Sequence, residues 1–196
     1  MLARPSAADL RPWLLAGLTV AATAAGLLAM GRAPFAPSGQ ALLWYGDPWG
    51  PEASGHVLDW YAPSHLIHGL LFYAVLWMAL PRLAVAWRFL LAVLIEAAWE
   101  MAENSPLVID RYRSVTASKD YGGDTVLNAT ADIAVMAAGF WLARFLPVWL
   151  SVALVIGFEA LTIWLIRDGL ALNVLMLLWP VEAIRDWQMA IAPAGP

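Results

Sequence analysis

The fold class is clearest in the run Leu83-Ala-Val-Ala-Trp-Arg-Phe-Leu-Leu-Ala-Val-Leu-Ile-Glu96-Ala-Ala-Trp-Glu100-Met-Ala-Glu103-Asn104. It is apolar and long enough to cross a bilayer as a helix, because a crossing needs about 20 residues. Glu96, Glu100 and Glu103 follow an i, i+4, i+7 spacing, which places them on one face of that helix. Lipid does not solvate carboxylates, so ionisable residues within a membrane helix indicate a functional site.

The composition is that of a membrane protein. Of the 196 residues, 62% are hydrophobic and 13% are charged, whereas soluble domains are about half apolar and about a quarter charged. The formal net charge is −4 and there is no run of Lys or Arg, so we expect no nucleic-acid surface. The absence of cysteine excludes disulfides, thiolate metal sites and Cys nucleophiles.

Hydropathy and helix-ending residues predict an all-α fold, a polytopic bundle of about six transmembrane helices in a single integral membrane domain over residues 1–196. The Pro- and Gly-rich segment 31–63 and the polar segment 105–123 are expected to be loops. Ser64 and Asp124 are the expected N-caps of the second and fourth helices, and Pro180 indicates a short or broken last helix. The predicted helices cover 13–30, 64–80, 83–104, 124–146, 148–166 and 169–184.

The distribution of basic residues predicts a cytoplasmic N-terminus. With the N-terminus inside, six basic residues fall on the cytoplasmic side and five on the other, the direction that the positive-inside rule favours. The basic N-terminus and the long, acidic first loop support the same orientation.

Alternating crossings bring polar side chains of three predicted helices to one side of the membrane. At about 1.5 Å per residue, Glu96 and Asp132 lie roughly 12 Å below the helix ends. Because the polar residues of each helix share one face, we expect the faces to meet in a pocket. These residues are His65 and His68 in the second helix, Glu96, Glu100 and Glu103 in the third, and Asp124, Asn128 and Asp132 in the fourth.

Carboxylates in apolar surroundings need a compensating positive or protic group. A divalent metal ion would supply one, and helical bundles build metal centres from His and carboxylate ligands. We therefore expect His65, His68, Glu100 and Asp132 as candidate metal ligands. In a metal-assisted hydrolase or transferase, the candidate catalytic residues are Glu96, Glu100 and Asp132, with Glu96 as the base.

The loop after the third helix carries a second candidate group. Arg111 and Arg113 suit an anionic headgroup such as phosphate. Asp124 and Asn128 are the other candidate residues for binding a ligand headgroup. Alternatively, the two arginines pair with the carboxylates and hold the loop as a lid, and this internal pairing is the favoured interpretation.

Two further functions are open at this point. A proton-coupled transporter would use Glu96, Asp132 and Glu159 as a relay, but the cytoplasmic halves of these helices are almost wholly apolar, which disfavours a continuous polar path. A non-catalytic scaffold or assembly protein would use the polar side chains only to fix helix packing. The expected partners are the lipid bilayer and a lipid or small polar ligand.

Several longer motifs stand out in the chain. They are Ser64-His-Leu-Ile-His-Gly69, Glu96-Ala-Ala-Trp-Glu100, Glu103-Asn-Ser-Pro-Leu-Val-Ile-Asp-Arg-Tyr-Arg113, Asp120-Tyr-Gly-Gly-Asp124 and the segment from Arg167 to Gln188. On these motifs the chain resembles uncharacterised protein family 0314, a bacterial family of multi-pass membrane proteins of unknown function. This resemblance implies a bacterial cell inner-membrane location and no particular activity. A more distant similarity is to VanZ-like membrane proteins, through the helix-start His, the Glu-bearing helix and an Asp…Asn…Asp helix start that ends in Gly139, and it suggests an envelope or lipid-associated role.

Overall fold

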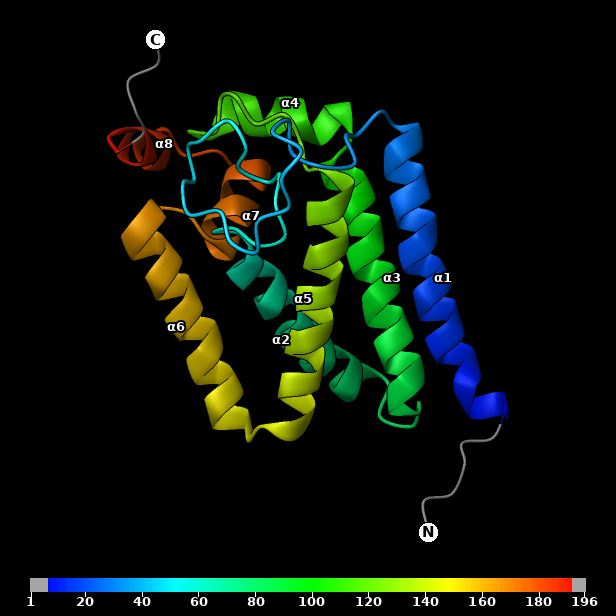
Figure 1. Cartoon of the computed structure of the whole chain (residues 1–196). Coiled ribbons are helices and arrows are strands. Elements are labelled where there is room, and N and C mark those ends of the chain that lie inside the picture. The colour runs from blue at the N-terminus through cyan, green and yellow to red at the C-terminus, as the bar shows by residue number, and fades with distance from the viewer. Residues whose placement is uncertain (1–6, 192–196) are drawn as a thin grey trace.

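The structure, a computed structural model, describes residues 7–191 and consists of helices and loops within that range (Figure 1). The long helices run between two ends of a bundle, and the connections 30–61 and 116–125 lie together at one end beside the short helices (Figure 1). The described helices are α1 Ala7–Ala29, α2 Ala62–Ala79, α3 Val85–Glu103, α4 Pro106–Val115, α5 Val126–Phe145, α6 Val148–Ile166, α7 Leu170–Leu178 and α8 Glu182–Met189.

The all-helical class is confirmed, whereas about six membrane crossings are not. Four helices, α1, α2, α5 and α6, are long and apolar enough to cross a membrane. Helix α3 has 19 residues but includes the glutamates and Arg88. Helix α7 has nine residues and is therefore about 14 Å long, too short for a hydrocarbon core of about 30 Å.

The sequence predicts a loop over 105–123, and this prediction is wrong because the segment contains α4. Ser105 is the N-cap of α4, since its hydroxyl accepts a hydrogen bond from the Val108 N–H at 3.4 Å. Pro106 occupies the first turn, where its missing N–H costs nothing. The proline that was expected only to end α3 also starts the next helix.

Two predicted N-caps are also wrong. Helix α5 begins at Val126 and its N-cap is Thr125, whose hydroxyl accepts from the Asn128 N–H at 3.2 Å. Asp124 lies one residue outside the helix. Helix α2 begins two residues earlier than predicted, with Tyr61 as its N-cap, so Ser64 is already inside the first turn.

The last predicted helix, 169–184, is two helices. Helix α7 ends at Leu178, and α8 begins at Glu182. Pro180 lies between them and cannot donate the backbone hydrogen bond that a continuous helix needs. This break was expected, but the second helix after it was not.

Two glycines let α2 and α5 cross with their backbones in contact. A Cβ atom on Gly69 would overlap the main-chain carbonyl oxygen of Met136, and a Cβ atom on Gly139 would overlap the carbonyl oxygen of Leu66. Small residues let helix backbones approach in this way. The crossing holds the polar first halves of both helices together.

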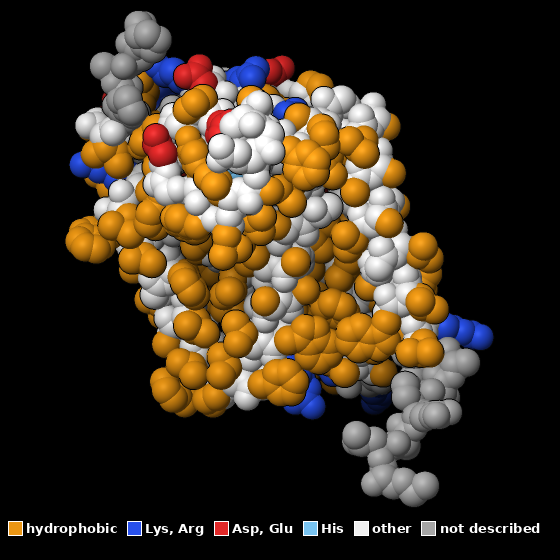
Figure 2. Space-filling model, viewed as in Figure 1, with side chains coloured by type: hydrophobic (Ala, Val, Ile, Leu, Met, Phe, Trp, Pro, Cys, Tyr) orange, Lys and Arg blue, Asp and Glu red, His pale blue; other side chains and the backbone are white. Residues whose placement is uncertain are grey.

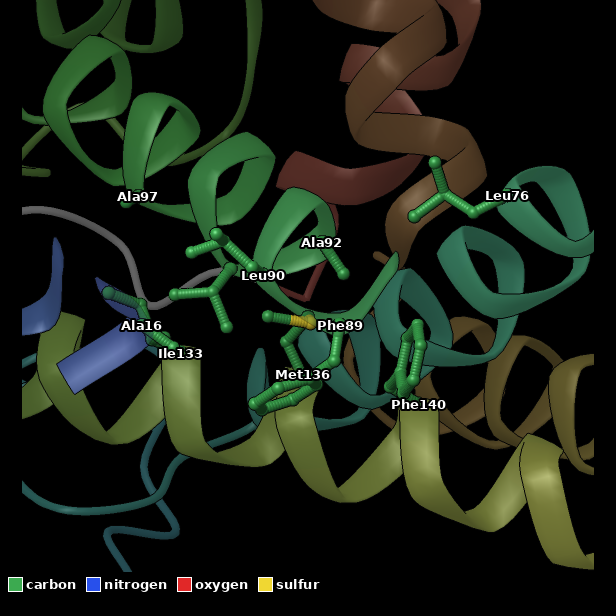
Figure 3. Packing of buried hydrophobic residues seen from close by; sticks show 10 residues of the cluster. Ala16, Leu76, Phe89, Leu90, Ala92, Ala97, Ile133, Met136 and Phe140 are labelled. Atoms are coloured by element: carbon green, nitrogen blue, oxygen red, sulfur yellow. The ribbon is translucent and has the colours of Figure 1, made fainter. Parts of the chain in front are cut away.

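An apolar cluster fills the half of the bundle that lies away from the loops. Its side chains come from α1, α2, α3 and α5, and Figure 3 shows residues of α3 and α5 packed against each other. On the outside, hydrophobic side chains cover the middle of the molecule, and charged ones gather toward its ends (Figure 2). The cluster consists of Ala16, Leu76, Phe89, Leu90, Ala92, Val93, Ala97, Ile133, Met136 and Phe140.

Candidate functional site

Two histidines and three carboxylates from α2, α3 and α5 meet near the loop end of the bundle. The Nδ1 atom of His65 lies 2.7 Å from an oxygen of Glu96 and 3.5 Å from Glu100 Oε1. Its Nε2 atom lies 3.8 Å from Asp132 Oδ2. The Nδ1 atom of His68 lies 3.0 Å from Glu96. We call these five residues the His/carboxylate cluster; the structure brings all of them together, as the sequence predicted.

Some polar atoms of the cluster have hydrogen-bond partners, and others do not. An ionised carboxylate only accepts hydrogen bonds, so both histidines donate from Nδ1 to Glu96 and leave Nε2 free. Glu100 is fully buried, and neither of its oxygens has a hydrogen-bond partner within residues 7–191; the same holds for Asp132 Oδ1. Buried polar atoms without partners are rare in native proteins. These oxygens therefore point to a missing partner.

A cavity of about 540 Å³ opens above the cluster and is lined in part by His65, Asn128 and Asp132. Other parts of its wall come from the segments 48–55 and 117–125. We call it the polar cavity. It provides room for a small molecule next to the cluster, which satisfies the expectation that these polar faces meet in a pocket.

Asp124, predicted as a headgroup ligand, forms part of the cavity wall and holds a loop in place. Its carboxylate accepts from the Asn104 side-chain amide at 2.8 Å and from the Tyr121 hydroxyl at 3.0 Å, and its own N–H donates to Asn104 at 2.7 Å. Burial, the largest influence, raises the pKa of Asp124. Both of its oxygens have partners, so the structure shows an anchoring role.

The expected pairing of Arg111 and Arg113 with the buried carboxylates is wrong. Arg111 donates from Nε to the main-chain oxygen of Leu177 at 3.0 Å. Arg113 donates to the main-chain oxygen of Tyr121 at 2.6 Å. Neither arginine is among the residues that line the polar cavity. Arg113 nevertheless anchors the loop that covers the cavity. The sequence predicted that the arginines hold this loop as a lid.

The cations that do line the polar cavity, Arg32 and Lys119, were missed. Arg32 donates from Nε to the main-chain oxygen of Asp124 at 3.2 Å and also bonds the Gly122 carbonyl, so it joins two loops far apart in the chain. No spacing in the sequence links positions 32 and 119 with the glutamates. Their proximity results from tertiary structure alone.

Asn128 links the cavity to a buried histidine that was also missed. Its amide donates to the main-chain oxygen of His56 at 3.0 Å. His56 is fully buried, lies 3.2 Å from Glu52 Oε2, and accepts from the Leu42 N–H at 3.3 Å. These contacts order the first loop, where a single histidine among Gly and Pro offers no periodic signal. Asn128 thus helps to form the wall of the cavity.

Glu159, the third member of the predicted relay, lies outside the cluster. Its carboxylate accepts from the N–H groups of Leu170 and Ala171 at 2.8 and 3.1 Å. A carboxylate at this position satisfies free donors at a helix start and complements the helix dipole. Glu159 therefore caps α7.

A second buried carboxyl near the site belongs to Asp168, in the turn between α6 and α7. It accepts from the Tyr61 hydroxyl at 3.2 Å and from the Gly169 N–H at 2.9 Å. Burial raises the pKa of Asp168 from 3.8 to about 7. The folded state therefore holds this proton more tightly than the unfolded state does, so the stability it contributes is complete below pH 3.8 and is lost as the pH rises through about 7.

Replacing Asp168 by Asn is expected to remove this pH dependence. The shift corresponds to roughly 4 kcal/mol, so the variant gains most of this stability over the wild type at pH 8 and gains little at pH 4. Thermal unfolding in detergent at the two pH values measures the difference. The exposed residue Asp186, replaced by Asn, is the control. An equal advantage at both pH values would contradict the prediction.

The match to known proteins covers most of the chain. A profile of a family described as "Protein of unknown function (DUF2585)" matches residues 27–190. The chain belongs to this family. A UPF0314 protein of Paracoccus denitrificans is 57% identical over 180 residues, which is 92% of this chain and 93% of the relative. One of Novosphingobium aromaticivorans is 56% identical over 167 residues, 83% and 84% of the two chains.

A third relative, the UPF0314 protein of Sphingopyxis alaskensis, is 49% identical over 176 residues, 90% of this chain and 94% of its own. These names confirm the resemblance to uncharacterised protein family 0314 that the motifs indicated. No solved structure matches the chain. Membership in the family brings no activity with it, so the function has to be argued from the site.

Proposed function

We propose that this is a multi-pass protein of the bacterial inner membrane that binds a divalent metal ion at the floor of the polar cavity. The ligands are His65, Glu100 and Glu103, joined by Asp132, which lies 3.8 Å from His65 Nε2. Glu96 is a positioning residue that holds the rings of His65 and His68. The ion acts on a small polar group, such as a lipid headgroup, that enters the cavity.

One observation carries this proposal. Glu100 presents two buried oxygens without hydrogen-bond partners, close to a histidine whose Nε2 atom is free. His65, Glu100 and Glu103 each offer a ligand atom, all within 4.8 Å of one another. Donors around a tetrahedral zinc ion are separated by roughly 3.4 Å, so small side-chain movements complete such a site.

A second trio, His65, His68 and Glu96, also falls within 4.8 Å. It is less suitable, because Glu96 already accepts from both histidines. A carboxylate that binds the far nitrogen of a metal-ligating histidine fixes its tautomer and its orientation. This arrangement supports Glu96 as a positioning residue and replaces its predicted role as base.

A metal ion at this place would supply the positive charge that the buried carboxylates lack. It would also polarise a bound phosphoryl or carbonyl oxygen, or lower the pKa of a bound water molecule. The polar cavity beside it has space for the substrate, and Lys119 adds a positive charge to its wall. These features support a hydrolase or transferase.

Transport through the bundle is less well supported. The apolar cluster of α1, α2, α3 and α5 fills the half of the bundle beyond the site, and Glu159 caps α7. A proton relay needs polar groups along that path.

We also propose that the N-terminus is cytoplasmic. The polar cavity then faces the outer leaflet of the membrane.

Elemental analysis of the purified protein in detergent tests the proposal. We expect about one metal ion per chain, and a loss of affinity of at least about tenfold in Glu100→Gln. The matched control is Glu182→Gln on the exposed side of α8, which should keep the metal. Folded wild-type protein that stays metal-free after incubation with zinc, manganese and magnesium would overturn the proposal.

The variant His68→Ala separates the two ligand sets. If His65, Glu100, Glu103 and Asp132 bind the ion, His68→Ala retains stoichiometric metal with reduced affinity. Loss of the metal in His68→Ala, with the metal retained in Glu100→Gln, would instead assign the ion to the trio that contains His68 and Glu96.

A further inference from the structure

A second cavity of about 140 Å³ lies between α2, α3, α4 and α7. Most of its wall is apolar. Helix α7 contributes Leu170, Asn173, Val174 and Leu177. Trp99 of α3 completes this side. We call it the apolar cavity. No local pattern indicates this cavity, because it depends on the short helix α7 packing beside the bundle.

The two cavities meet at the cluster. Four residues line both of them: Tyr61, His65, Glu103 and Tyr112. His65, a proposed metal ligand, is therefore reached from a polar side and from an apolar side. A single ligand that occupies both sides must itself have a polar and an apolar part.

The apolar cavity borders the hydrophobic exterior of the molecule. Val174 lines the cavity and is 44% exposed, so it belongs both to the cavity and to the outer surface. On the same helix Leu178 is 77% exposed, and Leu107 at the start of α4 is 81% exposed. A hydrocarbon chain in the cavity can continue from there into lipid.

Asn173 supplies an independent sign of a ligand. It is buried, with 7% of its surface exposed, and it lines the apolar cavity. Its side-chain oxygen has no hydrogen-bond partner in the described part of the chain. A buried acceptor without a partner is costly, and a hydroxyl or amide N–H at the junction of headgroup and chain would satisfy it.

We propose that the ligand of this site is a membrane amphiphile. Its anionic headgroup, a phosphate, occupies the polar cavity beside the metal ion and Lys119. One hydrocarbon chain passes His65 and Asn173 through the apolar cavity toward the bilayer. The inference rests on the proposed function, because the metal ion is what makes an acidic cavity suitable for an anion.

The test compares dodecyl phosphate with inorganic phosphate on zinc-loaded protein in phosphatidylcholine nanodiscs. The variant Leu177→Trp fills the apolar cavity. The matched control is Leu178→Trp on the adjacent, exposed position. The probe partitions into the same lipid in both experiments. A difference in binding between the two variants therefore reports on the cavity itself.

We expect Leu177→Trp to weaken binding of dodecyl phosphate by at least about tenfold, because the indole ring occupies the space that the hydrocarbon chain needs and the chain would have to overpack the cavity. Inorganic phosphate and zinc should bind to both variants as to the wild type, and Leu178→Trp should leave all three unchanged. Equal binding of dodecyl phosphate to the two variants, with zinc retained, would overturn the amphiphile and leave the metal site standing. Absence of zinc binding in the wild type would instead reject the proposed function and, with it, the headgroup assignment.

Discussion

Replacing Gly139 by Leu is expected to prevent α2 and α5 from packing and to leave little folded protein. Any Cβ atom at this position would overlap the main-chain carbonyl oxygen of Leu66, and Gly69 is equally restricted by Met136. Backbone cannot yield as a flexible side chain does, so the cost exceeds the roughly 1–3 kcal/mol of ordinary overpacking. Size-exclusion chromatography and thermal unfolding in detergent measure the loss.

The matched control is Gly157→Leu on α6, where, apart from the helix's own backbone and the neighbouring residues, no atom of residues 7–191 lies within 4 Å of the added Cβ. That change should preserve the folded protein, and the higher helix propensity of Leu favours it slightly. A Gly139→Leu variant as stable as Gly157→Leu would mean that the two backbones are not in contact. A loss in both variants would point to intolerance of bulk in these helices in general.

The second large effect concerns Glu100. Replacing it by Met is expected to raise the stability of the metal-free protein while abolishing metal binding. The wild-type carboxylate is fully buried without a hydrogen bond, and a buried polar group of this kind costs about 1–3 kcal/mol or more. An apolar side chain of similar volume removes that cost, as it does at other buried ionic sites.

Asn104, four residues further along the chain, provides the contrast. It is also buried, but its side-chain amide exchanges two hydrogen bonds with Asp124. Asn104→Leu should therefore lose about 2–4 kcal/mol, since it leaves the Asp124 carboxylate and N–H with fewer partners. Unfolding curves of both variants, recorded with and without zinc, measure the effects.

The two variants also test the scaffold interpretation. If the cluster only fixed helix packing, Glu100→Met would destabilise the protein as Asn104→Leu does. A gain in stability together with a loss of metal would show that Glu100 is retained for function, at a cost in stability. A loss of stability in metal-free Glu100→Met would contradict the proposed ligand role.

Several features of the fold follow from local sequence. Apolar runs predicted α1, α2, α3, α5 and α6; α1 begins six residues earlier than predicted, and the other ends lie within two residues of their predicted positions. The errors arose at proline and at caps. Pro106 starts α4 as well as ending α3, and Thr125 replaces Asp124 as a cap. Several residue types can cap a helix, and a proline can stand on either side of a helix boundary, so a single sequence does not decide these details.

The membership of the cluster also followed from sequence. Spacings of four on α3 and α5, together with antiparallel neighbours, were enough to place Glu96, Glu100 and Asp132 near His65 and His68, as the structure shows. A helix has a fixed rise and a fixed angle per residue, so depth and face can be calculated. The partners supplied by loops could not be calculated in this way.

The helical class, the apolar character of the bundle and the residues that face its interior could therefore be predicted from the amino-acid sequence. These depend on hydrophobicity and helical period, which are local properties. Three features depend on the three-dimensional arrangement. Glu96 accepts from two histidines, whereas the Glu100 carboxylate has no hydrogen-bond partner among the described residues. Arg32 and Lys119 line the polar cavity in place of Arg111 and Arg113, and α7 forms an apolar cavity beside it. Each of these depends on atoms far apart in the chain approaching within a few ångströms, and no local pattern encodes such distances.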